Sequence, residues 1–216
     1  ALPISRDVTT FRAWVSSPHA DDKRRLGVGV VLYLCFLACL LVILNGESGL
    51  MSQNEVVEPV IGLIGGSGLY DIDGLEEKEW RTVETPWGLP SDQLLFGRLD
   101  GVRCVFLPRH GRGHPIPPSR LNYRANIAAM KMSGVTDIVS LSAVGSLKEE
   151  LPPGHFVIVD QFIDRTIWRE KSFFDTGCVA HISMADPLCA RTGELLGAKS
   201  NAMRLGVTRG GTVLVL

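Results

Sequence analysis

The sequence predicts an α/β fold, in which strands alternate with helices from about Val60 onward. Three observations lead to this prediction: short apolar runs that end at turn residues, a strong hairpin signal, and helical spacing of apolar residues between the runs. The composition is that of an ordinary globular protein, with 45% hydrophobic and 21% charged residues among 216. Strands that alternate with helices favour a sheet covered by helices.

The first strand of this domain is expected at Val60–Ile64, an apolar run that enters a tight turn at Gly65-Gly66. Two further runs, Gln93–Arg98 and Val102–Leu107, flank the pair Asp100-Gly101. Asp-Gly between two such runs is typical of a β-hairpin turn. These segments therefore predict a buried strand followed by an antiparallel hairpin.

A helix is expected at Asn122–Ser133, because its apolar residues recur at helical spacing and Gly134 follows as a C-cap. Buried strands are expected at Ile138–Leu141 and Phe156–Val159, which are short apolar runs. The alternation of strand, helix and strand continues the α/β pattern.

A second helix is expected to start at Asp186-Pro187, because aspartate is a favoured N-cap and proline a favoured first helical residue. This helix should run to about Leu205 and end at Gly206. Gly211 to Leu216 begin another strand. Because the sequence stops where that strand is reached, we expect further elements of the sheet to be lacking.

The N-terminal extension, residues 1–50, differs from the rest. Leu26 to Leu44 contain no charge and would span about 28 Å as a helix, close to the thickness of a bilayer. One interpretation is a transmembrane helix, and another is a signal peptide, although no clear cleavage site follows. A third is a misplaced start, because Met51 begins an ordinary cytosolic N-terminus.

Charge and cysteine content restrict the class of protein. The net charge of −1 provides no electrostatic argument for nucleic-acid binding. The five cysteines form no CxxC pair, so neither a zinc site nor a disulfide framework is indicated. Reduced thiols in a cytoplasmic protein are expected.

Two segments that follow predicted strands carry donors for an anion. Gly65 to Gly68 can turn tightly and point backbone N–H groups at an anion, and Ser67 adds a hydroxyl. The segment LPRHGRGH places Arg109 and His110 among glycines, and the guanidinium fork matches phosphate oxygens. The alternatives are a plain strand-to-loop turn and a solvated basic loop.

A third segment, SLSAVGS, places Ser142 and Ala143 at the end of a predicted strand. Small residues there leave room for a ligand, as open α/β sheets commonly arrange it. A buried turn of small residues is the alternative.

Other polar residues are expected to be structural. Asn122 and Asn126 lie one turn apart on a helix face, which suggests capping and loop anchoring. Asp164 and Arg165 are expected to join an ion-pair network or to hold a loop. His181, in a stretch of small residues, has no role that its pattern alone assigns.

Taken together and in order, several stretches resemble the methylthioadenosine phosphorylase branch of the purine nucleoside phosphorylase superfamily. They are IGLIGGSGLYD, ETPWGLPSD, LPRHGRGH, PPSRLNYRANIAAMK, SAVGSL, PGHFVIVDQFIDRT, SFFD and HISMADPLC. The resemblance implies a phosphorylase/hydrolase-like fold of three layers, with a central mixed β-sheet flanked by helices, over residues 58–216. It also implies that the domain is incomplete at its C-terminus.

The resemblance implies a pentosyltransferase, in which phosphate attacks the ribosyl C1′ of 5′-methylthioadenosine and adenine and 5-methylthioribose 1-phosphate are released. Phosphate is a co-substrate, and no metal or other cofactor is implied. The residues that bind phosphate would be Ser67, Arg109, His110 and Ser142, with the backbone of Ala143. The group that protonates the purine would lie beyond Leu216, so no catalytic residue is assigned.

The resemblance further implies a cytoplasmic homotrimer or homohexamer, in which His181 contacts the substrate of the neighbouring subunit. A membrane partner is expected only if residues 26–44 are a genuine transmembrane helix. Three alternatives remain open: a purine nucleoside phosphorylase, a 5′-methylthioinosine phosphorylase, and a non-catalytic fragment that lacks the purine-binding half.

Overall fold

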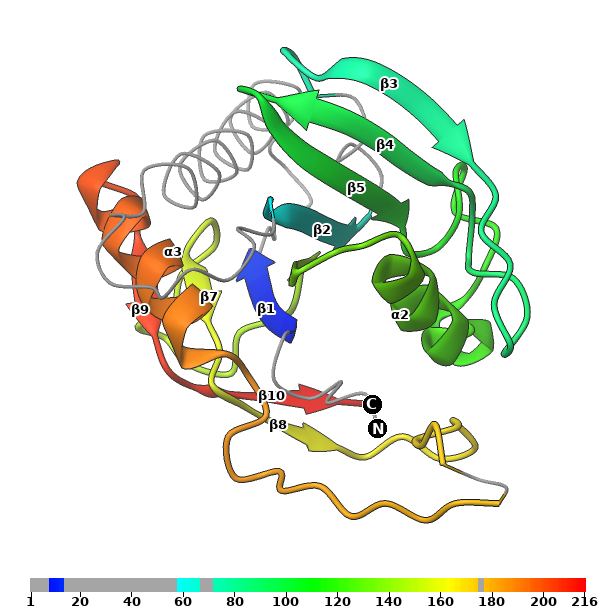
Figure 1. The fold of residues 1–216 in the computed structure, drawn as a ribbon. Coiled ribbons are helices and arrows are strands. Elements are labelled where there is room, and N and C mark those ends of the chain that lie inside the picture. Colours follow the sequence, from blue (N-terminus) through cyan, green and yellow to red (C-terminus); the bar gives the residue numbers. More distant parts are fainter. Residues whose placement is uncertain (1–7, 14–57, 67–71, 175–176) are drawn as a thin grey trace, which may run out of the picture.

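The computed structural model describes residues 8–13, 58–66, 72–174 and 177–216, with the backbone alone described for 8–13. Its main sheet has the strand order β3-β4-β5-β2-β6-β1-β7-β9 (Figure 1). The strands of this sheet are β1 (Val8–Ala13), β2 (Val60–Gly65), β3 (Glu76–Arg81), β4 (Leu94–Leu99), β5 (Val102–Pro108), β6 (Asp137–Ser142), β7 (Phe156–Ile158) and β9 (Val207–Arg209).

A second sheet and the helices complete the described part of the fold. The second sheet pairs β8 (Gln161–Asp164) with β10 (Thr212–Val215) in parallel. The helices are a 3₁₀ turn, η1 (Pro118–Arg120), and the α-helices α2 (Tyr123–Met132) and α3 (Ala190–Ala202).

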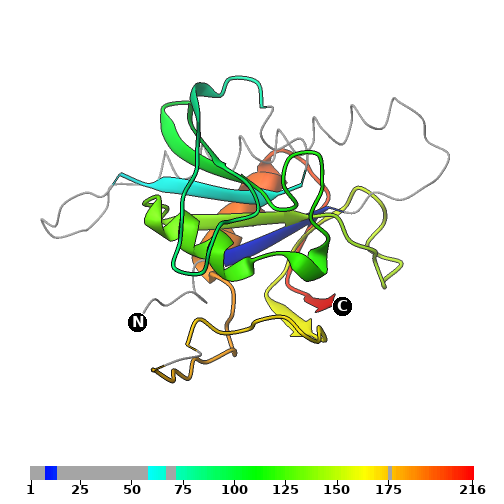
Figure 2. The same cartoon turned by 90° about the vertical axis from the view of Figure 1, so that its right-hand side faces the viewer.

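The main sheet is mixed. Strand β2 runs parallel to its neighbours β5 and β6, whereas the hairpin β4–β5 is antiparallel and joins the sheet to β3. Figure 2 shows β2, β6 and β1 side by side across the centre of the molecule. Parallel pairing brings the carboxyl ends of β5, β2 and β6 to one edge of the sheet.

Alternation along β2 divides the core into two layers. Val60 and Ile64 pack in a buried cluster with Met130 of α2, on one face of the sheet. Ile61 and Leu63 belong to a second cluster, which Leu196 of α3 joins on the other face. Figure 1 shows α2 and α3 at opposite sides of the sheet. The expected arrangement of a central mixed sheet flanked by helices is confirmed.

The predicted hairpin and first helix are confirmed. Asp100 and Gly101 both adopt positive φ, at 48° and 81°, between strands β4 and β5. The side chain of Asn122 caps α2 by accepting from the N–H of Ala125 at 3.1 Å. Gly134 follows the helix with a φ of 80°, a conformation that glycine adopts without steric cost.

The predicted start of the second helix is wrong. Helix α3 begins at Ala190, after Cys189 as the N-cap residue, and not at Asp186-Pro187. The Gln161 side chain donates to the carbonyl oxygens of Met184 and Ala185 at 3.2 and 3.4 Å. These bonds hold the chain beside β8, so the local capping signal does not start a helix there.

Strands β1, β3, β8 and β9 were not expected from the sequence. The run EEKEWR of β3 is largely charged and exposed, and it forms a strand because it pairs with the buried β4 at the edge of the sheet. Strand β1 lies between β6, to which it is parallel, and β7, to which it is antiparallel.

Residues 26–44 lie outside the described residues. Within the described ranges, no helix combines the length and the hydrophobicity that crossing a bilayer requires.

Candidate active site

Gly65, Arg109 and Ser142, one residue from each predicted anion segment, meet at one edge of the main sheet. In the sheet register, Gly65 at the end of β2 lies opposite Pro108 of β5, and Ile64 lies opposite Ser140 of β6. The N–H of Arg109 then donates to the carbonyl of Gly65 at 2.8 Å. Parallel pairing therefore places Gly65, Arg109 and the end of β6 side by side.

Arg109 is the cationic centre of this edge. Its guanidinium donates from one terminal nitrogen to the hydroxyl of Ser142 and from Nε to Nε2 of His110, the latter at 3.2 Å. Burial lowers the pKa of Arg109, and the nearby Tyr123 opposes that shift. Among the described residues, no carboxylate forms an ion pair with Arg109. A partly buried guanidinium without a carboxylate favours the binding of an external anion.

His110 is buried, with 6% of its surface exposed. Its Nδ1 lies 2.8 Å from the carbonyl oxygen of Ile116, and its ring stacks on His114 with centroids 4.3 Å apart. Burial lowers the pKa of His110, the Ile116 carbonyl raises it, and Arg109 and His114 lower it further. The net shift is downward, so the imidazole is neutral at neutral pH.

The loop around His110 is held in a tight conformation. Gly111 has a φ of 73°, and a Cβ there would lie 3.2 Å from the Ser91 carbonyl oxygen and 3.3 Å from Pro115. His114 also has a positive φ, at 62°, which few non-glycine residues adopt. The glycine at position 111 therefore allows the loop to bring the two imidazoles together.

The second arginine of the loop, Arg112, is already neutralised. Its Nη2 and Nε lie 3.1 and 3.2 Å from the carboxylate oxygens of Asp92. Burial opposes ionisation of Asp92, but the hydrogen bonds from Arg112 and from the N–H of Gln93, together with the charge of Arg112, outweigh it and lower the Asp92 pKa. The guanidinium also covers the Trp80 ring at 4.2 Å. Arg109, and not Arg112, is thus the loop arginine that is available to an anion.

Asn122, the N-cap of α2, and Asn126, within α2, support the loop that precedes β4. Asn122 donates to the Trp87 carbonyl at 2.7 Å. Asn126 accepts from the N–H of Ser91 at 2.7 Å and donates to its hydroxyl at 2.9 Å. The expected capping is confirmed for Asn122, and the expected loop anchoring is confirmed for both residues.

Asp164 holds the loop after β8, as expected. It accepts from the N–H of Thr166 at 2.8 Å and pairs with Lys171 at 2.9 Å. Hydrogen bonding from Thr166 and Lys171 lowers the pKa of Asp164 to about 2. The backbone N–H of Arg165 donates to Val215, which extends the pairing of β8 with β10.

The structure brings together some of the predicted site residues and does not describe all of them. Arg109, His110 and Ser142 lie together, and the exposed Ala143 follows Ser142 at the end of β6. Ser67 lies outside the described residues. The sequence pattern did not indicate the ring stacking of His114 on His110. That stacking depends on the backbone conformation of the loop, which the pattern does not show.

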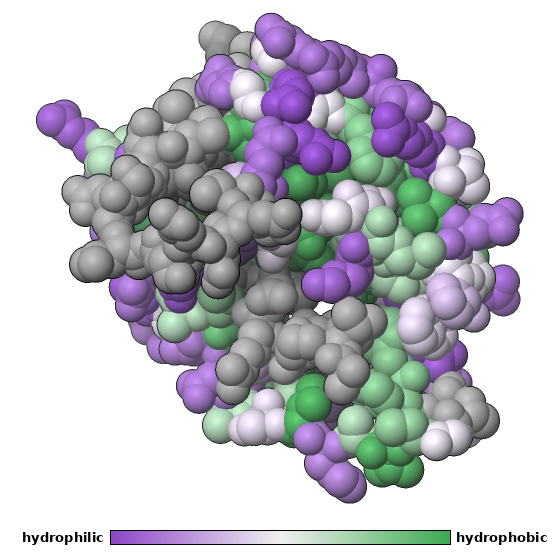
Figure 3. All heavy atoms as spheres, in the orientation of Figure 1, coloured by the Kyte–Doolittle hydropathy of each residue, from purple (hydrophilic) through white to green (hydrophobic). Residues whose placement is uncertain are grey.

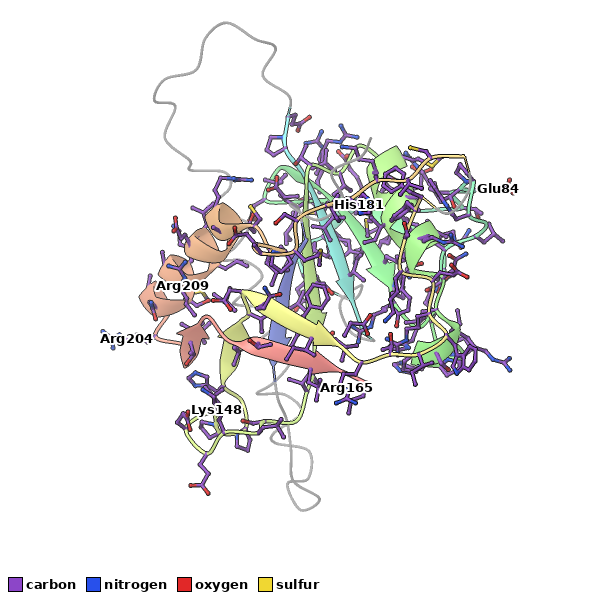
Figure 4. The ribbon with its side chains drawn as sticks, turned by 90° about the horizontal axis from the view of Figure 1, so that it is seen from below. Glu84, Lys148, Arg165, His181, Arg204 and Arg209 are labelled. Carbon is purple, nitrogen blue, oxygen red and sulfur yellow. The ribbon has the colours of Figure 1, made fainter. Side chains whose placement is uncertain are left out.

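His181 is the remaining predicted site residue. It is exposed on the extended segment between β8 and α3, as Figure 4 shows. Among the described residues, no hydrogen bond or ion pair joins it to Arg109, His110 or Ser142.

Comparison with known proteins identifies two parts of the chain. A model described as the phosphorylase superfamily matches residues 60–215, and one described as the cytochrome C1 family matches residues 3–48. The chain is 58% identical over 160 residues to the S-methyl-5'-thioadenosine phosphorylase of Cereibacter sphaeroides, covering 74% of this chain and 55% of that protein. It is 60% identical over 159 residues to the protein of that name from Rhodospirillum rubrum, covering 74% and 54%.

The chain is also similar to a solved structure of a protein with a related name. The methylthioadenosine phosphorylase from Schistosoma mansoni in complex with adenine has a TM-score of 0.67 and 40% identity, over 73% of this chain and 65% of that one. This chain therefore spans about half the length of the curated relatives that it matches. Because the superfamily model covers residues 60–215, the chain belongs to the phosphorylase superfamily.

Proposed function

We propose that the protein is a pentosyltransferase that catalyses phosphorolysis of 5′-methylthioadenosine to adenine and 5-methylthioribose 1-phosphate. The names of the relatives support the substrate, and adenine in the Schistosoma mansoni structure supports the base. The observation that carries the proposal is the partly buried Arg109, which donates to His110 and Ser142 and has no carboxylate partner among the described residues.

In the proposed reaction, phosphate binds beside Arg109 and Ser142, and the backbone of Ala143 and the hydroxyl of Ser67 complete its contacts. Charge-assisted hydrogen bonds from the guanidinium orient the phosphate oxygens and hold one of them for attack on C1′. Fixed donors in a partly buried site stabilise the anion without the reorganisation that water requires. Inorganic phosphate is a co-substrate, and the proposal includes no metal or organic cofactor.

The assay for this proposal measures base release. The full chain is incubated with phosphate and methylthioadenosine, methylthioinosine, adenosine or inosine, and the free base is quantified by chromatography. Adenine release from methylthioadenosine, abolished in Arg109→Met and retained in Arg103→Met on the exposed side of β5, is the expected result. Faster release from inosine or methylthioinosine would favour those alternative substrates instead.

A second candidate is phosphate binding without turnover. The observation that favours it is that the donors which Arg109 and Ser142 offer serve anion binding whether or not turnover follows. Saturable binding of inorganic phosphate in calorimetry, with no base released from any of the four nucleosides, would select this candidate over the enzyme.

We also propose a homotrimer or homohexamer. Exposed hydrophobic side chains gather on β8, β10 and the segment between β8 and α3, and Figure 3 shows hydrophobic residues at the surface over the lower part of the molecule. Trp168 is 97% exposed and Ile167 is 74% exposed. Apolar clusters of this kind mark protein interfaces. A monomeric mass in light scattering at micromolar concentration would contradict the proposal.

The proposed role of His181 in a neighbouring site has a specific test. If adenine release needs both residues, the Arg109→Met variant and the His181→Ala variant are each inactive on their own. Mixed oligomers of the two would contain some sites with an intact Arg109 and an intact His181. Recovery of adenine release on mixing and reassembly supports a shared site, whereas no recovery would place His181 outside it.

The chain divides into two proposed parts. We assign residues 58–216 to the phosphorylase domain and residues 1–50 to a separate extension, in agreement with the two family models. We propose a cytoplasmic phosphorylase domain, with a membrane tether only if residues 26–44 form a transmembrane helix. Extraction of cell membranes with alkaline carbonate tests this, because a tethered chain stays in the pellet.

A further inference from the structure

The segment that carries His181 is attached to β8 at its C-terminal end. The side-chain amide of Gln161 donates to the carbonyl oxygens of Met184 and Ala185 at 3.2 and 3.4 Å. The amide oxygen of Gln161 accepts from the N–H of Phe162 at 2.9 Å, so the side chain is fixed through both of its polar atoms. The chain shortly after His181 therefore stays beside β8.

The same segment is attached at its N-terminal end by an aromatic contact. The rings of Trp87 and Phe173 meet edge to face, with their centroids 4.8 Å apart and an interplanar angle of 86°. Such pairs attract because the positive edge of one ring meets the negative face of the other. At the preceding residue, the guanidinium of Arg124 donates to the carbonyl oxygen of Ser172 at 3.3 Å. Trp87 and Arg124 thus hold this end of the segment against the loop before β4 and against α2.

Hydrogen bonds fix the backbone that carries Trp87. The hydroxyl of Thr85 accepts from the N–H of Trp87 at 3.1 Å and donates to the carbonyl oxygen of Gly88 at 2.7 Å. The carbonyl oxygen of Trp87 accepts from the side chain of Asn122, the N-cap of α2, at 2.7 Å. Phe173, by contrast, belongs to a part of the chain in which residues 165–174 and 177–189 form no helix or strand. The Trp87 ring is therefore the fixed side of the contact.

Between the two attachments, the described residues 177–183 are largely exposed. Ala180 alone among them is half-buried, and Val179 and Ile182, close to His181, are 80% and 56% exposed. A stretch with so little burial gains almost no fixed position from its own packing. The places of its two ends therefore determine where His181 projects.

We propose that Trp87 is a positioning residue for the shared site: by holding Phe173, it determines where the segment presents His181 to the neighbouring subunit. The inference rests on the proposed function and on the proposed role of His181, and it adds a residue from a different loop. Without the Trp87 ring, Phe173 loses its partner and the N-terminal end of the segment is held less firmly. The defect then lies in the subunit that donates His181, while Arg109 of that same subunit stays intact.

Mixed oligomers distinguish the two subunits that form one site. Trp87→Ala should lower the rate of adenine release at saturating substrate by at least about tenfold, because small misplacements of a positioned group reduce turnover steeply. Mixing and reassembly with Arg109→Met should restore release, since that subunit donates an intact segment to the intact Arg109 of its neighbour. Mixing with His181→Ala should restore nothing, because every donated segment in that mixture is defective. The reverse pattern would mean that Trp87 supports Arg109 in its own subunit, and any pattern other than the expected one contradicts the inference.

A second measurement follows the segment directly and does not depend on activity. In hydrogen–deuterium exchange, peptides that span residues 170–185 should exchange faster in Trp87→Ala than in the unmodified protein. Trp87→Phe keeps a ring against which Phe173 can pack, so it should retain both the slower exchange and adenine release. The matched control is Leu89→Ala, in the same loop, where the side chain is 57% exposed and exchange should stay unchanged. Unchanged exchange in Trp87→Ala would overturn the inference, whatever the activity of that variant.

The outcomes separate the role of Trp87 from the function on which it rests. If Arg109→Met and His181→Ala complement each other but Trp87→Ala departs from the expected pattern, only the role of Trp87 is wrong. If the unmodified protein releases no adenine, the proposed function is wrong. If Arg109→Met and His181→Ala do not complement each other, the shared site is wrong. In both of these last cases the role of Trp87 is wrong as well.

Discussion

The side chain of Asn126 binds Ser91 twice, accepting from its N–H at 2.7 Å and donating to its hydroxyl at 2.9 Å. Asn126 is 3% exposed on α2, so these bonds attach the loop before β4 to the helix that follows the Arg109 loop. The same loop contains Asp92, the partner of Arg112. Asn126 therefore supports the sheet edge that carries Arg109 and Ser142, although it does not itself contact either residue.

The first prediction concerns this bond. Asn126→Ala leaves a backbone N–H of Ser91 without its partner and should lower the free energy of unfolding by about 2 kcal/mol. Urea denaturation measures the change. The control is Asn201→Ala, an exposed position near the end of α3, where a loss below about 0.5 kcal/mol is expected. Equal losses at both positions would contradict the assigned role of Asn126.

The second prediction concerns packing behind β2. A Cβ at Gly62 would lie 2.7 Å from Val135 Cγ1 and 3.2 Å from Met130 Sδ, both in the buried cluster under α2. Gly62→Ala should destabilise the protein by about 1–3 kcal/mol through overpacking. Gly193→Ala, whose Cβ would meet Ile158 at 3.5 Å, should instead stabilise helix α3 by about 0.5–1 kcal/mol. Thermal unfolding of the two variants should thus shift in opposite directions.

The third prediction concerns acid stability. The folded-state pKa of Asp164 is about 2, below the ordinary aspartate value, so its ionised form is the one that folding favours. The stabilisation is present above the unfolded-state pKa, near pH 4, and is lost as pH falls toward 2. Because the pair with Lys171 is largely solvated, its size should stay below about 1 kcal/mol.

The measurement for Asp164 is a pH series of urea denaturation. Asp164→Asn should be less stable than the unmodified protein at neutral pH and equal to it near pH 2. Asp186→Asn, at an exposed position, should show no such convergence. If the difference in unfolding free energy between Asp164→Asn and the unmodified protein grows as pH falls, the prediction is wrong.

The fourth prediction concerns Arg109. Arg109→Lys keeps the charge but removes the planar fork of donors, so it should weaken phosphate binding by at least about tenfold in titration calorimetry. Arg103→Lys, exposed on β5, is the matched control and should leave the affinity unchanged. An unaltered phosphate affinity in Arg109→Lys would mean that the guanidinium does not hold the anion.

Local signals determined much of the secondary structure. Asp100-Gly101 specifies a hairpin because both residues tolerate the positive φ that the turn requires. Asn122 specifies the start of α2 because its side chain accepts from a free backbone N–H of the first turn. These features depend on a few neighbouring residues, so they are readable without the fold. The same reasoning placed α3 too early, because Gln161 from a distant strand holds the backbone of Met184.

By itself, the sequence also determined which residue types could bind an anion: the arginine, the histidine and the hydroxyls that follow apolar runs. Only the tertiary structure decided which of them meet. Arg109 bonds Ser142 because β5, β2 and β6 pair in parallel and bring their carboxyl ends to one edge. Arg112 is excluded because Asp92, a residue of another loop, neutralises it. Such contacts join residues far apart in the chain, so no local pattern encodes them.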